Sequence, residues 1–137
     1  MYDPVLVQPL RDEVTRLGAK ELSTREDVDI ALRQAGTTLV FVNSVCGCAA
    51  GGARPGLALS LINGNRPDHL VTMFAGVDQE AIERLRELLH PHEITSAPEM
   101  ALVKDGAVTR IWRRQDIVGR DPSSIAHSLM KAFEKYC

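Results

Sequence analysis

The feature that most constrains the fold is an uninterrupted run of β-branched and apolar residues from Thr37 to Val42. A strand with no charged face must be covered by other elements on both sides, as in the centre of an α/β sheet. The run leads directly into Asn43-Ser44-Val45-Cys46-Gly47-Cys48 and then into a turn of small residues, Ala49 to Gly52. Because sites in open α/β sheets form at the carboxyl ends of strands, we expect a functional site here.

Helical and strand-like segments alternate along the rest of the chain. Helices are expected to begin at Pro9, at Ser23 with a capping box to Glu26, near Ala53, at Asp78 and at Asp121-Pro122. Further strands are expected at Lys20–Leu22, Leu70–Phe74, Met100–Val103 and Val108–Arg113, the last two joined by a turn at Asp105-Gly106. This order predicts a single α/β domain over residues 1–137, in three layers with a mixed central sheet and helices on both faces.

Composition narrows the function classes. The net charge of −2 and the aromatic content of 4% argue against nucleic acid as a partner. No apolar run reaches the roughly 20 residues of a membrane-spanning helix, so no membrane partner is expected. The first residues lack the basic and apolar regions of a secretory signal. An odd count of three cysteines is not a disulfide framework of the secreted kind, so the expected location is the cytoplasm.

Cys46 and Cys48 are the candidate catalytic residues. A helix that begins just after them would present free N–H groups, which stabilise a thiolate, and the thiolate is the nucleophile of disulfide exchange. A disulfide that closes over Gly47 alone is expected to be strained and therefore easily reduced, which favours oxidant or isomerase chemistry. Glycine would help because it tolerates unusual backbone angles. The alternative is a monothiol route in which this disulfide matters little.

Other residues are candidates for the surroundings of the site. Ala97-Pro98 precedes a strand after a long loop, and we expect a cis peptide bond beside the nucleophile. Arg54 would stabilise the thiolate or hold an acidic substrate group, or else would be an ordinary solvated arginine. Asn43 and Ser44 would bond near the thiolate or simply satisfy the turn. We expect Trp112 to serve packing rather than a substrate groove.

Two other function classes remain open at this stage. One is a metal-binding module that uses Cys46, Cys48 and Cys137. A structural zinc site needs four ligands, and the histidines (His69, His90, His92 and His127) show no paired ligand spacing outside one loop, so we expect no metal. Cys137 is more simply a free surface thiol than a further resolving cysteine. The other class is a redox sensor without turnover.

The segment Asn43 to Gly51, followed by Ala53-Arg54-Pro55, resembles the bacilliredoxin family. The likeness extends along nearly the whole chain, through Thr37–Val40, Val71–Gly76, Ser96–Leu102 and the terminal Cys137. The resemblance implies a thioredoxin-like fold and an enzyme that removes bacillithiol, a low-molecular-weight thiol, from protein cysteines. Weak disulfide-isomerase activity is also associated with the family.

The resemblance also assigns roles. Cys46 would attack the mixed disulfide, and Cys48 or a second bacillithiol would resolve the adduct. From their positions in the sequence, and not from the resemblance, Gly47, Arg54, Ala97 and Pro98 are the expected substrate contacts, in a groove between the Cys46 turn and the Pro98 loop. Bacillithiolated client proteins are the implied partners, with bacillithiol as co-substrate and no resident cofactor. A general protein disulfide isomerase or reductase is the alternative function.

Overall fold

The computed structural model describes residues 2–62, 64–90 and 97–137; His92 and Ser96, which were considered above, lie outside these ranges. The elements follow one another as α1 (Pro4–Thr15), β1 (Lys20–Glu21), α2 (Arg25–Arg33), β2 (Thr37–Asn43), the π-helix η1 (Ala49–Ala53), α3 (Arg54–Ser60), β3 (His69–Phe74), α4 (Gln79–Leu89), β4 (Glu99–Lys104), β5 (Ala107–Trp112), α5 (Arg114–Ile117) and α6 (Pro122–Tyr136).

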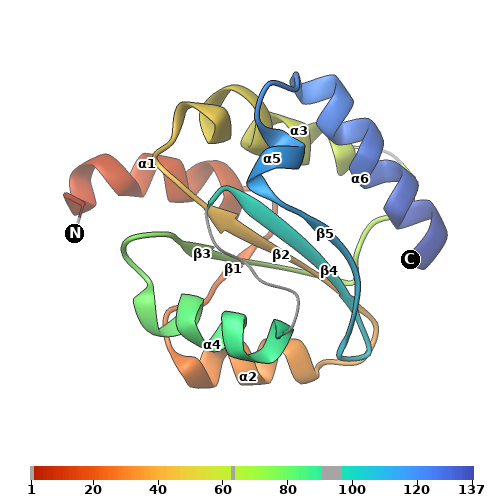
Figure 1. Ribbon diagram of the computed structural model, residues 1–137, viewed down its shortest axis with the longest axis horizontal. Helices are drawn as coiled ribbons and strands as arrows, with labels where there is room; N and C mark the ends of the chain where they lie inside the picture. The colour runs from red at the N-terminus through yellow and green to blue at the C-terminus, as the bar shows by residue number, and fades with distance from the viewer. Residues whose placement is uncertain (1, 63, 91–96) are drawn as a thin grey trace.

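The strands form one sheet in the order β1-β3-β2-β4-β5. The pairs β1–β3 and β2–β3 are parallel, whereas β2–β4 and β4–β5 are antiparallel. Figure 1 shows α1, α3, α5 and α6 on one face of this sheet and α2 and α4 on the other. The expectation of three layers around a mixed sheet, with the Thr37 run as its buried central strand, is confirmed, and so is the short strand near Lys20.

The register of the sheet brings distant segments to one edge. Asn43 at the carboxyl end of β2 pairs with Phe74 at the end of β3, and Val42 pairs with Glu99 at the start of β4. Because β4 runs antiparallel to β2, the residues that precede β4 lie beside those that follow β2. The cysteine turn and the Ala97-Pro98 segment are therefore neighbours in space.

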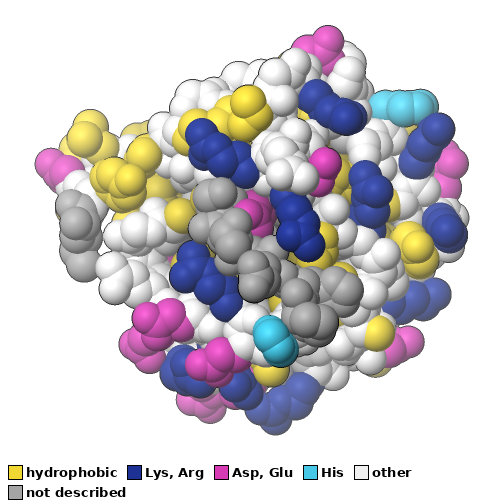
Figure 2. All heavy atoms as spheres, in the orientation of Figure 1, with side chains coloured by type: hydrophobic (Ala, Val, Ile, Leu, Met, Phe, Trp, Pro, Cys, Tyr) yellow, Lys and Arg dark blue, Asp and Glu magenta, His cyan; other side chains and the backbone are white. Residues whose placement is uncertain are grey.

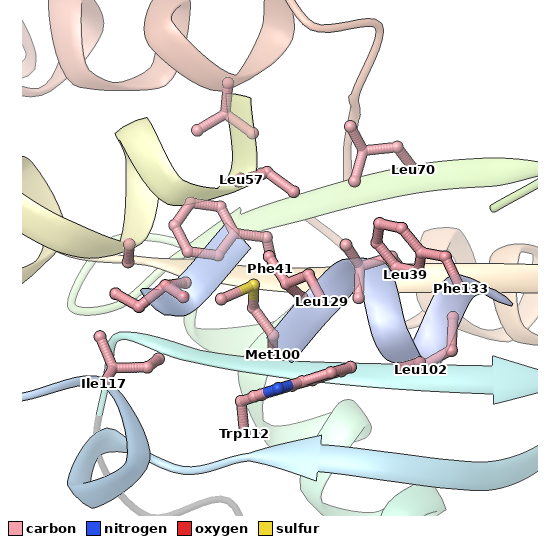
Figure 3. Packing of buried hydrophobic residues seen from close by; sticks show 14 of the residues in the cluster. Leu39, Phe41, Leu57, Leu70, Met100, Leu102, Trp112, Ile117, Leu129 and Phe133 are labelled. Atoms are coloured by element: carbon pink, nitrogen blue, oxygen red, sulfur yellow. The ribbon is translucent and has the colours of Figure 1, made fainter. Parts of the chain in front are cut away.

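Each face of the sheet carries its own hydrophobic core. Alternate residues of β2 point to opposite faces, so Leu39 and Phe41 pack under α3 and α6, whereas Val40 and Val42 pack against α2 and α4. Figure 3 shows the first of these clusters, in which Phe41 and Met100 lie among Leu57, Leu129 and other apolar side chains. Trp112 belongs to this cluster at 2% exposure, and its Nε1 donates a hydrogen bond to Ser128 Oγ at 2.8 Å. Trp112 is thus a packing residue, as expected.

Two helices begin at other residues than the sequence suggested. The first helix begins at Asp3-Pro4, where the Asp3 carboxylate accepts a hydrogen bond from Val5 N, so Pro9 lies inside the helix. The second is capped by Thr24 with Asp27 in the capping box, not by Ser23 with Glu26. In the second helix a neighbouring hydroxyl takes the cap, whereas the first helix begins five residues earlier, at Pro4 after an aspartate cap. The short helix α5, which follows β5 directly, was not predicted at all.

The helical segment after the cysteines packs closely on α6. Cβ atoms built on Gly52 and Gly56 would lie 3.1 Å from Ile125 Cδ1 and 2.7 Å from Ile125 Cγ2, respectively. Ile125 is itself 2% exposed. The absence of side chains at these glycines therefore sets how near α3 can come to the first turns of α6.

On the face shown in Figure 2, basic side chains are interspersed with acidic and hydrophobic ones. Hydrophobic side chains gather where α1 begins, and Val5 and Leu6 there are 78% and 68% exposed. Among the described residues, no helix combines the length and the apolar character needed to cross a bilayer.

Candidate active site

A ladder of side-chain hydrogen bonds shapes the turn after β2. Asn43 Nδ2 donates to the Leu10 carbonyl at 3.0 Å, which ties the strand end to α1. Ser44 N donates to Asn43 Oδ1 at 2.8 Å, and Cys46 N donates to Ser44 Oγ at 3.0 Å. Both polar side chains thus satisfy the turn, which was one of the two roles expected for them. The ladder fixes the backbone that carries Cys46.

Cys46 and Cys48 form a disulfide, with a Cα–Cα distance of 5.4 Å, and both are half-buried. The helical segment η1 begins directly after Cys48, and Ala49 N donates to the Cys46 carbonyl at 3.0 Å. Cys48 N donates to Cys46 Sγ at 3.4 Å. The pair therefore lies where the central strand gives way to a helix, as the sequence predicted, although the expected turn from Ala49 to Gly52 is wrong because these residues are themselves helical.

Gly47 is exposed, and a Cβ added to it would meet no atom within 4 Å. Its φ is not in the left-handed region, which among the described glycines is occupied at other positions. The expectation that glycine would help here through an unusual backbone angle is therefore wrong for this conformation. A side chain at this position would point into open space.

The Ala97–Pro98 bond is cis, as expected. An arginine that the sequence analysis did not single out joins this segment to the nucleophile. Arg114 Nη1 donates to the Ala97 carbonyl at 2.5 Å, and Arg114 Nη2 donates to Cys46 Sγ at 3.3 Å. Cys46 Sγ thus accepts two hydrogen bonds, one from Arg114 and one from its own turn. Among the described residues, none donates a hydrogen bond to Cys48 Sγ.

Arg54 lies beneath the turn and is 3% exposed, so the alternative of a solvated arginine is wrong. Its Nη1 donates to Asn43 Oδ1 at 3.1 Å and to the Ser44 carbonyl at 2.9 Å. Its Nε pairs with Glu13 of α1 at 3.1 Å. These contacts make Arg54 a support for the backbone of the turn, and its contact with a thiolate or substrate stays a prediction.

Replacing Arg54 by methionine is expected to lower the free energy of unfolding by about 1–2 kcal/mol. The buried Asn43 and Ser44 oxygens lose their charged donor, whereas Glu13 is 40% exposed and regains water, so the cost stays below that of breaking a fully buried pair. Chemical denaturation compares the variant with wild type. Arg16→Met, which removes the exposed arginine that follows α1, is the matched control and should change little. Equal midpoints for Arg54→Met and wild type would contradict the assigned role.

Cys137 lies apart from the site. It is exposed and follows α6, whose 15 residues extend for about 22 Å from the end that packs on η1. Figure 1 shows the C-terminus at the far end of this helix. This placement agrees with a free surface thiol rather than with a further resolving cysteine. Within the described ranges, no group of three His, Cys, Asp or Glu side chains is arranged to hold a metal ion, so the metal-binding alternative gains no ligand set there.

Comparison with known proteins places these features in context. Residues 2–137 match the family model described as disulphide isomerase. A bacilliredoxin of Geobacillus kaustophilus is 48% identical over 132 residues, which cover 96% of this chain and 90% of that protein. A bacilliredoxin of Staphylococcus aureus is 45% identical over 137 residues, which cover 100% of this chain and 94% of that protein.

The fold has a counterpart among solved structures. A structure of Plasmodium falciparum thioredoxin superposes with a TM-score of 0.50 at 17% identity, covering 87% of this chain and all of that one. At this identity the likeness concerns the fold alone. It confirms the expected thioredoxin-like α/β architecture.

Proposed function

The chain belongs to the disulphide isomerase family and is a thiol–disulfide oxidoreductase, and from this premise we propose that it removes bacillithiol from protein cysteines. The name bacilliredoxin, carried by relatives that are 45–48% identical over almost the whole chain, supports this substrate. Bacillithiol is then a co-substrate, no resident cofactor takes part, and the clients are bacillithiolated proteins. We place this activity in the cytoplasm, because a low and odd cysteine count suits a reducing compartment.

The observation that carries the order of events is the asymmetry between the two sulfurs. Two N–H groups, from Arg114 and Cys48, point at Cys46 Sγ. Donors that face a sulfur favour its thiolate, and the thiolate is the attacking species. Cys46 therefore attacks the mixed disulfide. The new bond joins Cys46 to the bacillithiol sulfur, the client sulfur leaves as a thiolate, and that thiolate takes a proton from water.

The second step returns the enzyme to the oxidised form. The Cys48 thiolate attacks Cys46 Sγ, the Cys46–Cys48 bond forms, and bacillithiol leaves with the electron pair of the broken bond. Two electrons from the cysteine pair have then reduced one mixed disulfide. Gly47 is exposed between the two cysteines, and Arg114 joins the cis Ala97–Pro98 segment to Cys46, so Gly47, Ala97 and Pro98 are the proposed substrate contacts. Val45, 41% exposed beside Cys46, adds an apolar contact for the client.

The substrate is tested by single-turnover reduction of one client protein carrying either bacillithiol or glutathione. The reduced enzyme is expected to clear the bacillithiol adduct about tenfold faster or more, since recognition of a ligand's own polar groups discriminates at least at that level. Product thiols are separated and quantified by mass.

Two outcomes would redirect the proposal. Equal rates on both adducts would indicate a general reductase. No reduction of either adduct, together with refolding of a scrambled disulfide protein, would favour the disulfide isomerase suggested by the description of the family model.

A further inference from the structure

Arg114 is held in place from both sides. It opens the short helix α5, in which Asp116 Oδ2 accepts a hydrogen bond from Arg113 N at 2.9 Å. Ile117 of the same helix is 1% exposed and belongs to the core under α6. The backbone of Arg114 is thereby anchored, and its guanidinium is half-buried against the cysteine turn. An arginine anchored in this way loses little freedom when it bonds to a sulfur.

The charge of Arg114 is not taken up by a carboxylate within the described ranges. Arg54 pairs with Glu13, and Arg11 pairs with Asp78 at 3.0 Å. Arg114, in contrast, makes its hydrogen bonds to a carbonyl oxygen and to a sulfur. A guanidinium bound to neutral acceptors keeps its full attraction for an anion that forms beside it.

We propose that Arg114 is a catalytic residue of the exchange reaction, which stabilises the Cys46 thiolate and at the same time fixes it against the Ala97–Pro98 segment. The inference rests on the proposed function for its chemical step, in which the lone pair of the Cys46 thiolate forms the new S–S bond. Nη2 faces the sulfur that carries the negative charge before the attack, and Nη1 holds the segment that borders the incoming substrate. One planar side chain thus sets both the charge and the position of the nucleophile.

Other charged or titratable groups stand on the elements that border the turn. They are Cys48 on the turn itself, Arg54 on α3 with Glu13 on α1, Arg11 with Asp78 after β3, Glu99 at the start of β4, and Arg113 and Asp116 at α5. Of these described groups, none places a charged atom within hydrogen-bond distance of Cys46 Sγ, which distinguishes Arg114. Removal of Arg114 should therefore change the ionisation of Cys46 more than removal of any other single cation.

The test is the pH dependence of alkylation of reduced Cys46 by iodoacetamide, followed by peptide mass mapping in a Cys137→Ser background. In Arg114→Gln the pH midpoint should rise by about one unit, the lower end of what an opposite charge at this distance produces. At pH values below the midpoint the rate should fall about tenfold. Arg114→Lys keeps the positive charge but cannot bond to Cys46 Sγ and the Ala97 carbonyl with two separate N–H groups of a planar guanidinium. Its pH midpoint should therefore lie between those of wild type and Arg114→Gln.

Arg66→Gln is the matched control, because it removes the same charge from an exposed residue between α3 and β3. Unchanged midpoints in both Arg114 variants would overturn the proposal, as would an equal shift in Arg66→Gln. If Arg114 only holds the Ala97–Pro98 segment in position, both variants lower the denaturant concentration at the unfolding midpoint but leave the pH midpoint of alkylation unchanged. The assay contains no bacillithiol, so it gives the same answer whether or not the substrate proposal holds.

Discussion

Replacing Cys46 by serine is expected to abolish mixed-disulfide reduction, with a loss of about a thousandfold or more, as for removal of other enzymatic nucleophiles. A serine hydroxyl does not ionise near neutral pH, so the two N–H groups that face Cys46 Sγ have no anion to stabilise. Replacing Cys48 should have a different effect. The first attack proceeds, the client is released, and the small thiol stays bound to Cys46.

Intact mass and peptide mapping after incubation with a bacillithiol-modified client separate these outcomes. The Cys48→Ser variant should accumulate an adduct on Cys46, and the Cys46→Ser variant should accumulate none. Cys137→Ser is the control and should keep wild-type turnover, because this residue lies at the opposite end of α6. An adduct on Cys48 in Cys46→Ser, with none on Cys46 in the other variant, would reverse the roles.

The second large effect is expected at Gly56, where α3 meets α6. A Cβ there would lie 2.8 Å from Ile125 Cβ and 3.2 Å from the Pro122 carbonyl oxygen, and valine adds two further methyl groups. Overpacking of this kind costs about 3 kcal/mol, whereas a glycine-to-alanine change gains at most about 1 kcal/mol of helix propensity. Steric overlap therefore decides the sign. Gly56→Val should unfold at clearly lower denaturant concentration, and Gly56→Ala should fall between it and wild type.

Gly51→Ala gives the matched control, because a Cβ at Gly51 meets nothing within 4 Å. Its free energy of unfolding should equal that of wild type or exceed it by at most about 1 kcal/mol, the gain in helix propensity. If Gly56→Val unfolds at the same denaturant concentration as wild type, α3 and α6 can move apart far enough to accommodate the side chain at no cost. The prediction would then be wrong. Because η1 and α3 follow the cysteines, the folded fraction of Gly56→Val should also be tested for a slower exchange reaction.

The sequence predicted the sheet better than it predicted the helix ends. The run from Thr37 to Val42 contains no charged residue, so it is stable only as a buried central strand. Because the cysteines follow this run almost directly, their place at its carboxyl end is determined as well. Helix starts were harder to predict because Pro4 and Pro9, five residues apart, both offer a proline start, and Ser23 stands next to Thr24. Small differences in local capping energy choose between such neighbours.

The surroundings of the cysteines were predicted only where backbone topology decides them. Pro98 comes to Cys46 because β4 returns beside β2, and the order of strands implies that return. Arg114 is 68 residues from Cys46 and belongs to a stretch with several arginines, so no spacing marks it as different from Arg110 or Arg113. Arg54 was identified by its position, yet its ion-pair partner, Glu13, comes from a separate helix. Contacts of this kind follow from tertiary packing and leave no periodic signal.

The exposed thiol at the end of α6 has a practical consequence. When the Cys46–Cys48 bond is closed, Cys137 is the one cysteine of the three that remains available to a maleimide. A dye or surface tether can therefore be attached to the oxidised wild-type protein at this one residue. It lies about 22 Å from the end of α6 that packs on η1. The same exposure means that purified material can cross-link into dimers through this residue, and such dimers would carry two intact and accessible reaction centres.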